Sequence, residues 1–141
     1  MSNRIKKRVR DVMMPTFACV DGLTTIEEAI RIARHEQVKA LIVNKRDDDD
    51  EFGIVLMNDI AKKVLSLNRA PERTNVYEIM TKPALSVSPD MNVKYCARLF
   101  ERFGISRAPV IERGEVLGMV SYNNIVLNGM LSDVESNSQV D

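Results

Sequence analysis

The order of apolar and polar residues along the chain occurs twice. A shift of about 67 residues superimposes the apolar positions of the two copies: Val12-Met13 on Ile79-Met80, Val20 on Val87, Ile26 on Val93, Val38 on Ile105 and Val43 on Val110. After a difference in loop length, Gly53-Ile54-Val55 matches Gly118-Met119-Val120. Because both copies must satisfy one pattern of burial, the repeat constrains the fold more than any local propensity. One structural unit is duplicated.

Within the first copy the periodicity changes from strand to helix, then to two strands, then back to helix. The predicted elements are a strand at 18–20, a helix with apolar positions from Ile26 to Ala33, strands at 40–43 and 52–57, and a helix over 60–67. The pairs Thr24…Glu27 and Thr25…Glu28 offer capping boxes for the first helix. An acidic turn, Asp47 to Glu51, separates the two later strands.

The second copy repeats this order with clearer start and stop signals. The predicted elements are a helix from Ser88-Pro89-Asp90 to Phe103-Gly104, a hairpin of strands 108–111 and 116–120 across Arg113-Gly114, and a helix opened by Ser121. A β-α-β-β-α unit of this size cannot cover its own sheet. We therefore expect an α/β fold of the α+β kind, with the two copies packed sheet to sheet around a pseudo-twofold axis.

These patterns also predict the organisation of the chain. The expected segments are a basic N-terminal arm at 1–8, the first repeat at 9–68, a linker at 69–75, the second repeat at 76–131 and a disordered polar tail at 132–141.

Composition narrows the functional classes. Twenty basic and twenty acidic side chains cancel in a chain of 141 residues, so no whole-molecule field selects nucleic acid or membrane. The chain has neither an apolar run of about 18 residues nor a signal-peptide core, which favours a cytoplasmic protein without membrane contact. Cys19 and Cys96 lack partners at metal-ligand spacing, and we expect both to be buried apolar residues.

Three segments resemble one known family. They are Met80-Thr81-Lys82-Pro83, the run from Gly104 to Val110, and Gly118-x-x-Ser121-x-x-Asn124. In this order and spacing they are similar to a tandem pair of cystathionine-β-synthase (CBS) domains, or Bateman module, over residues 9–131. Members of that family commonly bind AMP, ADP or ATP in clefts between the two domains. Others bind S-adenosylmethionine, dinucleotides or metal ions, or have no known ligand.

The resemblance implies a ligand site on the second-copy motif. Ser121 and the N–H groups at the helix start suit a phosphate, and Asn124 suits ribose hydroxyls. Arg107 would contact the phosphates, because a guanidinium matches phosphate bidentately. The other residues that the resemblance places around the adenine are Thr81, Lys82, Ala84, Leu85, Ile105, Ser106 and Pro109.

The first copy departs from the motif. Leu56 occupies the hydroxyl position and leaves a phosphate oxygen unpaired, at a cost of about 1–3 kcal/mol. Ile42 stands where the second copy has Pro109. Asp59 could still hold a ribose, with charge from Lys39 or His35. We therefore expect one competent site and one poorer site.

Each assignment has a structural alternative. Ser121 and Asn124 can serve only as a helix cap, and Arg107 can be an exposed charge at a strand edge. The turn Asp47 to Glu51 could chelate a cation but lacks calcium-loop spacing, which favours a solvated hairpin tip. The basic residues of 4–10 lack aromatic stacking partners, which favours solvation or protein docking over nucleic-acid binding.

No catalytic motif occurs in the chain, and we expect a non-enzyme that requires no cofactor. The favoured function is a free-standing regulatory module that binds an adenine nucleotide, forms a homodimer and signals to an effector protein. A ligand-independent interaction module is the alternative, and sensing of S-adenosylmethionine, metal or nucleic acid is a third. Candidate dimer contacts are Ile30, Ala33, Leu99 and Phe103.

Overall fold

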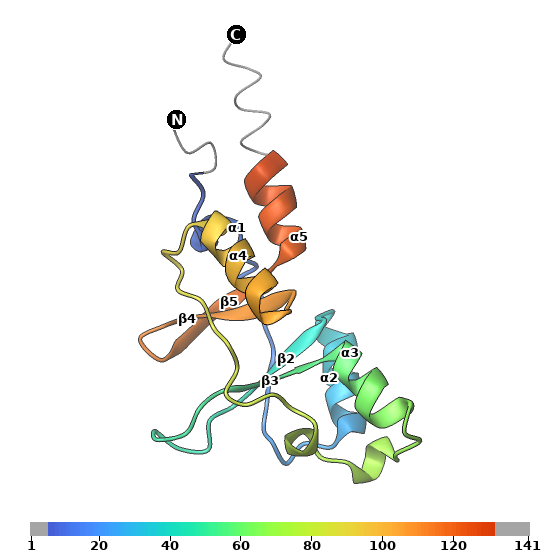
Figure 1. Cartoon of the computed structure of the whole chain (residues 1–141). Coiled ribbons are helices and arrows are strands. Elements are labelled where there is room, and N and C mark those ends of the chain that lie inside the picture. The colour runs from blue at the N-terminus through green and yellow to red at the C-terminus, as the bar shows by residue number, and fades with distance from the viewer. Residues whose placement is uncertain (1–5, 132–141) are drawn as a thin grey trace. The chain divides into compact units, whose positions relative to one another are not determined.

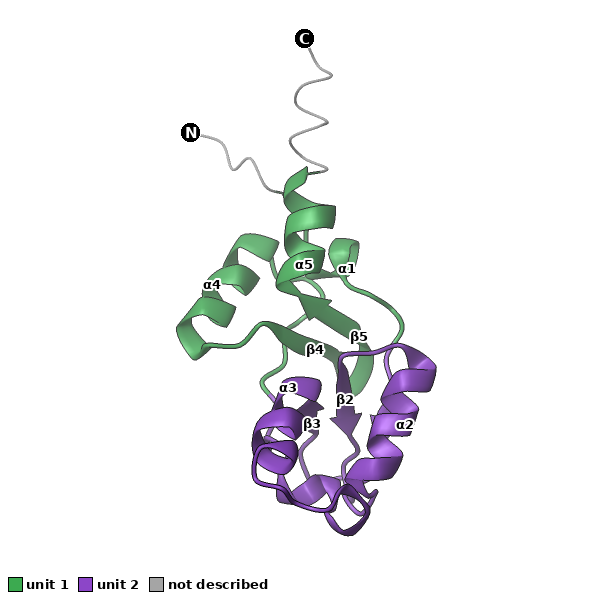
Figure 2. Cartoon of the chain, turned by 90° about the vertical axis from the view of Figure 1, so that its right-hand side faces the viewer, with its two compact units in different colours: residues 1–16, 85–141 green, residues 17–84 purple. Residues whose placement is uncertain are grey.

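The computed structural model describes residues 6–131 and divides the chain into two compact units (Figure 2). The first-repeat unit consists of residues 17–84. The second-repeat unit combines the chain before residue 17 with the chain from residue 85 onward. Each unit therefore contains the segment that opens the other copy.

The first-repeat unit is built on a three-stranded sheet in the order β1-β2-β3. Its strands are β1 (Cys19–Val20), β2 (Ala40–Val43) and β3 (Gly53–Leu56), with β1 parallel and β3 antiparallel to β2. The helices of the unit are α2 (Ile26–Glu36), α3 (Met57–Ile60) with its π-helical continuation Ala61–Leu65, and 3-10 turns at Pro71–Arg73 and Val76–Glu78 (Figure 1). Mixed helices and small sheets confirm the α+β class.

Helix α2 begins and ends at residues whose chemistry suits those positions. The hydroxyl of Thr25 accepts a hydrogen bond from the N–H of Glu28 at 3.2 Å, as the second of the two predicted capping boxes requires. Gln37 ends the helix in the left-handed conformation. Between these ends, Ile26, Ala29 and Ala33 face the core, as their spacing predicts.

The second-repeat unit packs its helices against a two-stranded antiparallel sheet. Its elements are α1 (Val9–Val12), α4 (Val93–Phe103), β4 (Arg107–Glu112), β5 (Glu115–Ser121) and α5 (Tyr122–Asn124), which continues as a π-helix over Ile125–Met130. Arg113 and Gly114 both have positive φ, as a two-residue hairpin turn requires, and this confirms the predicted turn. The core contains fully buried Phe100, whose ring meets Tyr122 edge-on at 5.3 Å.

The predicted start of the second helix is wrong. Helix α4 begins at Val93 with Asn92 as its cap, and not at Ser88. The preceding residues bind α1 instead: the carbonyl of Pro89 accepts from Arg10 N–H at 2.9 Å, and that of Met91 accepts from Val9 N–H at 2.8 Å. Because these carbonyls accept hydrogen bonds from α1, they are not available for the hydrogen bonds of α4, and the helix starts after them.

The two cysteines differ. Cys96 is fully buried, as predicted, and burial raises its pKa to about 11. Cys19 is exposed on the short edge strand β1, so the expectation of a buried residue is wrong there. The predicted arm, residues 1–8, lies partly within the fold, since the carbonyl of Lys7 accepts from Val93 N–H at 3.0 Å and Arg8 pairs with Asn92. Residues 1–5 and the predicted disordered tail lie outside the described residues.

Each exchanged opening segment is held by a pair of backbone hydrogen bonds. Met14 and Met119 exchange N–H···O bonds of 2.8 and 2.9 Å in the second-repeat unit, and Ile54 and Thr81 exchange two of 2.9 Å in the first. Glycine permits both approaches. A Cβ at Gly118 would overlap the carbonyl of Met14, and one at Gly53 would lie 3.0 Å from the sulfur of Met80.

We expect Gly118→Ala to destabilise the protein by about 1–3 kcal/mol, because the new methyl group displaces the Met14 backbone from β5. Gly129→Ala is the matched control, since its Cβ would meet only side chains at 3.6 Å and beyond. Urea denaturation measures both free energies of unfolding. Equal effects of the two variants would contradict the close packing of the opening segment.

Candidate functional site

The second-copy motif lies at the junction of β5 and α5. The N–H and hydroxyl of Ser121 both donate to Oδ1 of Asn124 at 3.0 Å, and the N–H of Asn124 donates to Oγ of Ser121 at 3.2 Å. Ser121 is buried, with 9% of its surface exposed. The two residues therefore form a reciprocal capping box, which confirms that they cap the helix and leaves a ligand role open.

Arg107 opens β4 directly opposite Ser121 in the β4–β5 ladder. It is half-buried, and this desolvation lowers the pKa of Arg107 below its ordinary value. Within residues 6–131 its guanidinium has no carboxylate or hydrogen-bond partner. It is not the freely exposed strand-edge charge of the structural alternative.

Other predicted site residues of this unit lie close along the chain to Arg107. The carbonyl of the exposed Ser106 accepts from Tyr122 N–H at 3.0 Å, which ties the segment to the start of α5. Ile105 packs partly against the core. Pro109 is buried, and its carbonyl accepts from Val87 N–H at 3.1 Å. This bond ties the segment that contains the half-buried Leu85, two residues before Val87, to β4. The structure thus brings the 105–109 segment and the motif together at one edge of β4–β5.

The remaining residues predicted for this site belong to the first-repeat unit. Thr81 pairs with Ile54, and the N–H of Ala84 donates to the carbonyl of Phe52 at 2.8 Å, so this segment extends the sheet beside β3. Lys82 is engaged too, with Nζ 2.7 Å from the carboxylate of Asp50.

The poorer first-copy site keeps the geometry of the motif without its hydroxyl. Oδ2 of Asp59 accepts from Leu56 N–H at 3.2 Å, as Asn124 does in the second copy. Lys39 is exposed just before β2, and its carbonyl accepts from Met57 N–H at 3.1 Å. His35 is exposed near the end of α2. Leu56 presents an apolar side chain at the position of Ser121.

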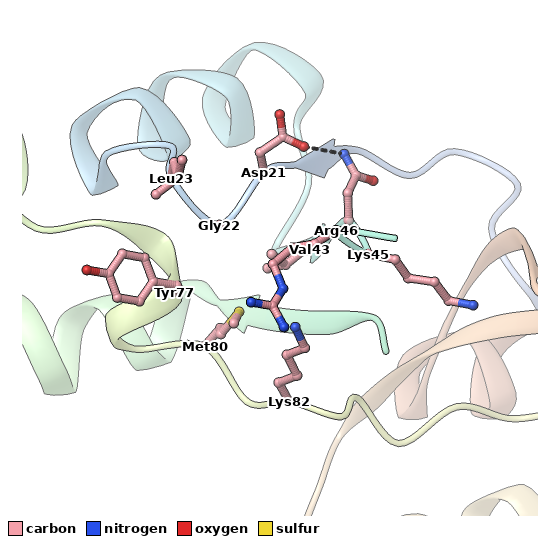
Figure 3. A pocket seen from close by; sticks show the side chains of 10 residues that line it. Asp21, Gly22, Leu23, Val43, Lys45, Arg46, Tyr77, Met80 and Lys82 are labelled. Carbon is pink, nitrogen blue, oxygen red and sulfur yellow. Dashed lines mark hydrogen bonds between the residues drawn. The ribbon is translucent and has the colours of Figure 1, made fainter. Parts of the chain in front are cut away.

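A pocket of about 740 Å³ in the first-repeat unit was not predicted (Figure 3). Its lining includes the apolar Leu23, Tyr77 and Met80 and the basic Lys45, Arg46 and Lys82. The sequence patterns at this lining do not indicate a pocket: Lys82 belongs to the predicted adenine site, and the turn after Arg46 is predicted to be a solvated acidic tip. Lys45 and Arg46 directly precede that turn, and Lys82 contacts it through Asp50.

Asp50 shows why the solvated-tip interpretation is wrong for one residue of the turn. Only 8% of its side chain is exposed, and the carboxylate binds Lys82 Nζ at 2.7 Å and Arg46 Nε at 3.0 Å. These hydrogen bonds hold the pKa of Asp50 well below its usual range. Asp47, Asp48 and Asp49 are exposed, as expected of a solvated tip. Nowhere in 6–131 do three or more His, Cys, Asp or Glu residues gather as metal ligands.

With this geometry in place, comparison with known proteins identifies the chain. The model of the CBS domain matches it twice, at residues 9–66 and 76–128. The chain belongs to the CBS domain family. A CBS pair is generally a regulatory module. Between residues 6 and 131, no helix has the length and apolar character that crossing a membrane requires.

Relatives of the CBS pair include proteins of different sizes. An uncharacterized protein of Methanopyrus kandleri is 30% identical over 73% of the chain, which spans 52% of that protein. The CBS domain-containing protein YhcV of Bacillus subtilis is 26% identical, over 89% of the chain and 87% of YhcV. The matched part of the chain thus spans about half of the Methanopyrus kandleri protein and most of YhcV.

Two solved structures are also similar. A hexameric CBS-CP12 protein from bloom-forming cyanobacteria has a TM-score of 0.86 and 34% identity, over 89% of this chain and 69% of that one. The CBS domain pair of protein MJ0100, in complex with 5′-methylthioadenosine and S-adenosyl-L-methionine, has a TM-score of 0.73 and 25% identity, over 85% and 97%.

The Asp50 contacts predict an acid-sensitive contribution to stability. Because the pKa of Asp50 is lowered in the folded protein, its contribution is present above the unfolded value of 3.8 and is lost as pH falls through the folded value. We expect Asp50→Asn to lower the melting temperature at about pH 7, and the difference from the parent protein to shrink below pH 3.8. Asp48→Asn, which alters an exposed neighbour, is the control. A difference independent of pH would contradict the ion pairs.

Proposed function

We propose that this CBS pair is a non-catalytic regulatory module that binds an adenine nucleotide at the second-copy motif. The observation that carries the proposal is Arg107. Burying part of a cation without a counter-ion is unfavourable, and an anion beside Arg107 would offset that cost. Ser121 and Asn124 lie at the adjacent helix start, where the positive end of the helix dipole also favours a phosphate.

The relatives support an adenosine-containing ligand. The MJ0100 domain pair was solved with two such molecules, 5′-methylthioadenosine and S-adenosylmethionine. Neither of them carries a phosphate, whereas an unpaired guanidinium is well matched to one. This difference favours a nucleotide over S-adenosylmethionine for the present chain. Leu56 makes the first-copy motif the poorer site, because it offers a phosphate no donor.

Signalling would follow if the nucleotide binds one conformational state of the protein more tightly than another. A ligand shifts a conformational equilibrium only as far as it prefers one state. We expect the protein to form a homodimer whose geometry, or whose affinity for an effector protein, depends on nucleotide occupancy. No part of this mechanism requires a bound cofactor.

Calorimetric titration with AMP, ADP, ATP, S-adenosylmethionine and 5′-methylthioadenosine tests the site. We expect a nucleotide to bind most tightly, and Arg107→Ala to weaken it about 10- to 100-fold through loss of charge-assisted hydrogen bonds. Arg107→Lys should restore part of the affinity, since it keeps the charge but not the planar fork.

Arg102→Ala is the matched control, because Arg102 is an exposed cation on α4 of the same unit. Melting curves confirm that each variant is folded. Binding of S-adenosylmethionine in preference to every nucleotide, or nucleotide binding unchanged by Arg107→Ala, would refute the assignment.

A ligand-independent dimerisation module is the second candidate, and one observation favours it. Four apolar side chains are 44–60% exposed on the last helix: Val126, Leu127, Met130 and Leu131. Their spacing places them on one stripe, as in helix-mediated association. Of the dimer contacts predicted from sequence, Ala33 is buried and unavailable, whereas Ile30 and Phe103 are exposed and Leu99 is half-buried.

We expect Leu127→Glu to weaken self-association at least tenfold, because it places a charge in the apolar stripe. Sedimentation equilibrium measures the effect, and Ser86→Glu, which adds the same charge at an exposed polar residue of the same unit outside this helix, is the control. If Leu127→Glu dissociates the protein and nucleotides fail to bind the parent, dimerisation alone accounts for the module. Unchanged association would exclude this stripe.

A further inference from the structure

We propose that the pocket of the first-repeat unit binds a small phosphorylated molecule with a planar apolar body, its phosphate on Arg46 and Lys82 and its body against Tyr77 and Leu23. This proposal is independent of the proposed function. The pocket lies where the chain leaves β1 and β2, formed in part by the turn after Val20 and the residues after Val43. Lys39, which belongs to the first-copy motif, directly precedes the start of β2, whereas the pocket lies at the end of that strand.

The cationic part of the pocket is held in place from behind. Figure 3 shows the guanidinium of Arg46 and the ammonium of Lys82 close to each other, whereas Lys45 extends away from them. Asp50 accepts hydrogen bonds from both, at 3.0 Å from Arg46 Nε and 2.7 Å from Lys82 Nζ. One carboxylate therefore positions two cations and neutralises only one charge.

Donors remain free on both cations. Of the Arg46 side chain, only Nε is engaged, and its two terminal nitrogens have no partner among the residues described. Lys82 Nζ lies 2.7 Å from both carboxylate oxygens of Asp50, which leaves at least one of its three donors free. Asp21, the acidic lining residue, accepts from the side-chain amide of Asn44 at 3.0 Å. A phosphate could thus accept several charge-assisted hydrogen bonds without displacing an existing contact.

The other side of the pocket is apolar. Tyr77 is 52% exposed and Leu23 78% exposed, and Figure 3 places both on the side away from Arg46 and Lys82. Gly22 lets the turn approach closely, since its Cβ would lie 3.3 Å from that of Tyr77, and the Gly22 carbonyl accepts from Tyr77 N–H at 2.9 Å. An open aromatic ring near two cations suits a planar group attached to a phosphate.

The size of the pocket agrees with such an occupant. Its volume of about 740 Å³ lies within the range of small-molecule sites and greatly exceeds that of a single phosphate. The chemistry of the lining, with cations at one end and apolar surface at the other, favours a ligand that has both parts. We therefore choose phenyl phosphate as the probe, with inorganic phosphate and phenol as its separate halves.

Heteronuclear NMR titration of the full chain with these three probes tests the proposal. Phenyl phosphate should shift the amides of residues 21–23, 44–46 and 77–82, and bind at least tenfold more tightly than phosphate or phenol. Arg46→Gln and Lys82→Met should each weaken binding about tenfold or more. Lys62→Met, at an exposed lysine of the same unit that is not part of the pocket lining, is the matched control and should change the affinity less than twofold.

Further variants separate this pocket from the second-copy motif. Tyr77→Ala should bring the affinity of the pocket for phenyl phosphate close to that for inorganic phosphate. Arg107→Ala should leave unchanged the shifts that phenyl phosphate causes at residues 21–23, 44–46 and 77–82. Both variants remove a side-chain partner of Asp50, but Arg46→Gln keeps the backbone N–H that donates to Asp50 at 2.9 Å. Arg46→Gln therefore provides the decisive comparison if Lys82→Met unfolds. Absence of binding, equal losses in Lys62→Met and Arg46→Gln, or shifts confined to residues 105–124 would each overturn the proposal.

Discussion

The exchange of opening segments between the two copies is the constraint on which the rest of this structure depends. A strand edge left open exposes unpaired N–H and C=O groups, which is unfavourable and prone to aggregation. Here Thr81 covers the β3 edge of one unit, and Met14 covers β5 of the other. Val12 and Ile79, which precede these pairings, are buried in the cores of the units that receive them. Neither copy has a complete core or sheet without the opening segment of the other.

The packing of the opening segments explains some residues of the family motif by their role in folding, and so distinguishes them from residues that could serve a ligand. Gly118 is required because the Met14 backbone passes against it, and Ser121 and Asn124 satisfy one another at the start of a helix. These residues have structural reasons to be present even in a chain without a ligand. No contact among the described residues gives such a structural reason for Arg107, since its half-buried guanidinium makes no hydrogen bond or ion pair within residues 6–131. It is therefore the most informative residue about binding.

The sequence predicted features that depend on local chemistry and missed those that depend on which segments meet. Thr25, Gly104 and the Arg113-Gly114 turn mark their elements because capping and positive φ are properties of single residues. Periodicity places apolar residues inward but does not reveal which segment covers them. For this reason the start of α4, the exposure of Cys19 on an edge strand and the burial of Asp50 differ from expectation. The pocket, whose lining comes from three separate segments, was not visible from spacing.

The reciprocal exchange also bears on how such a chain could arise. In a polypeptide with a single copy, the opening segment would fit the rest of another copy, and its own sheet would remain uncovered. Two such polypeptides could complete each other only by exchanging opening segments across a subunit boundary. Joining the copies in one chain replaces that encounter by an intramolecular event at high effective concentration. Gene duplication would thereby replace a concentration-dependent assembly by a single chain that completes its own fold. Each copy could then diverge, as the difference between Leu56 and Ser121 illustrates.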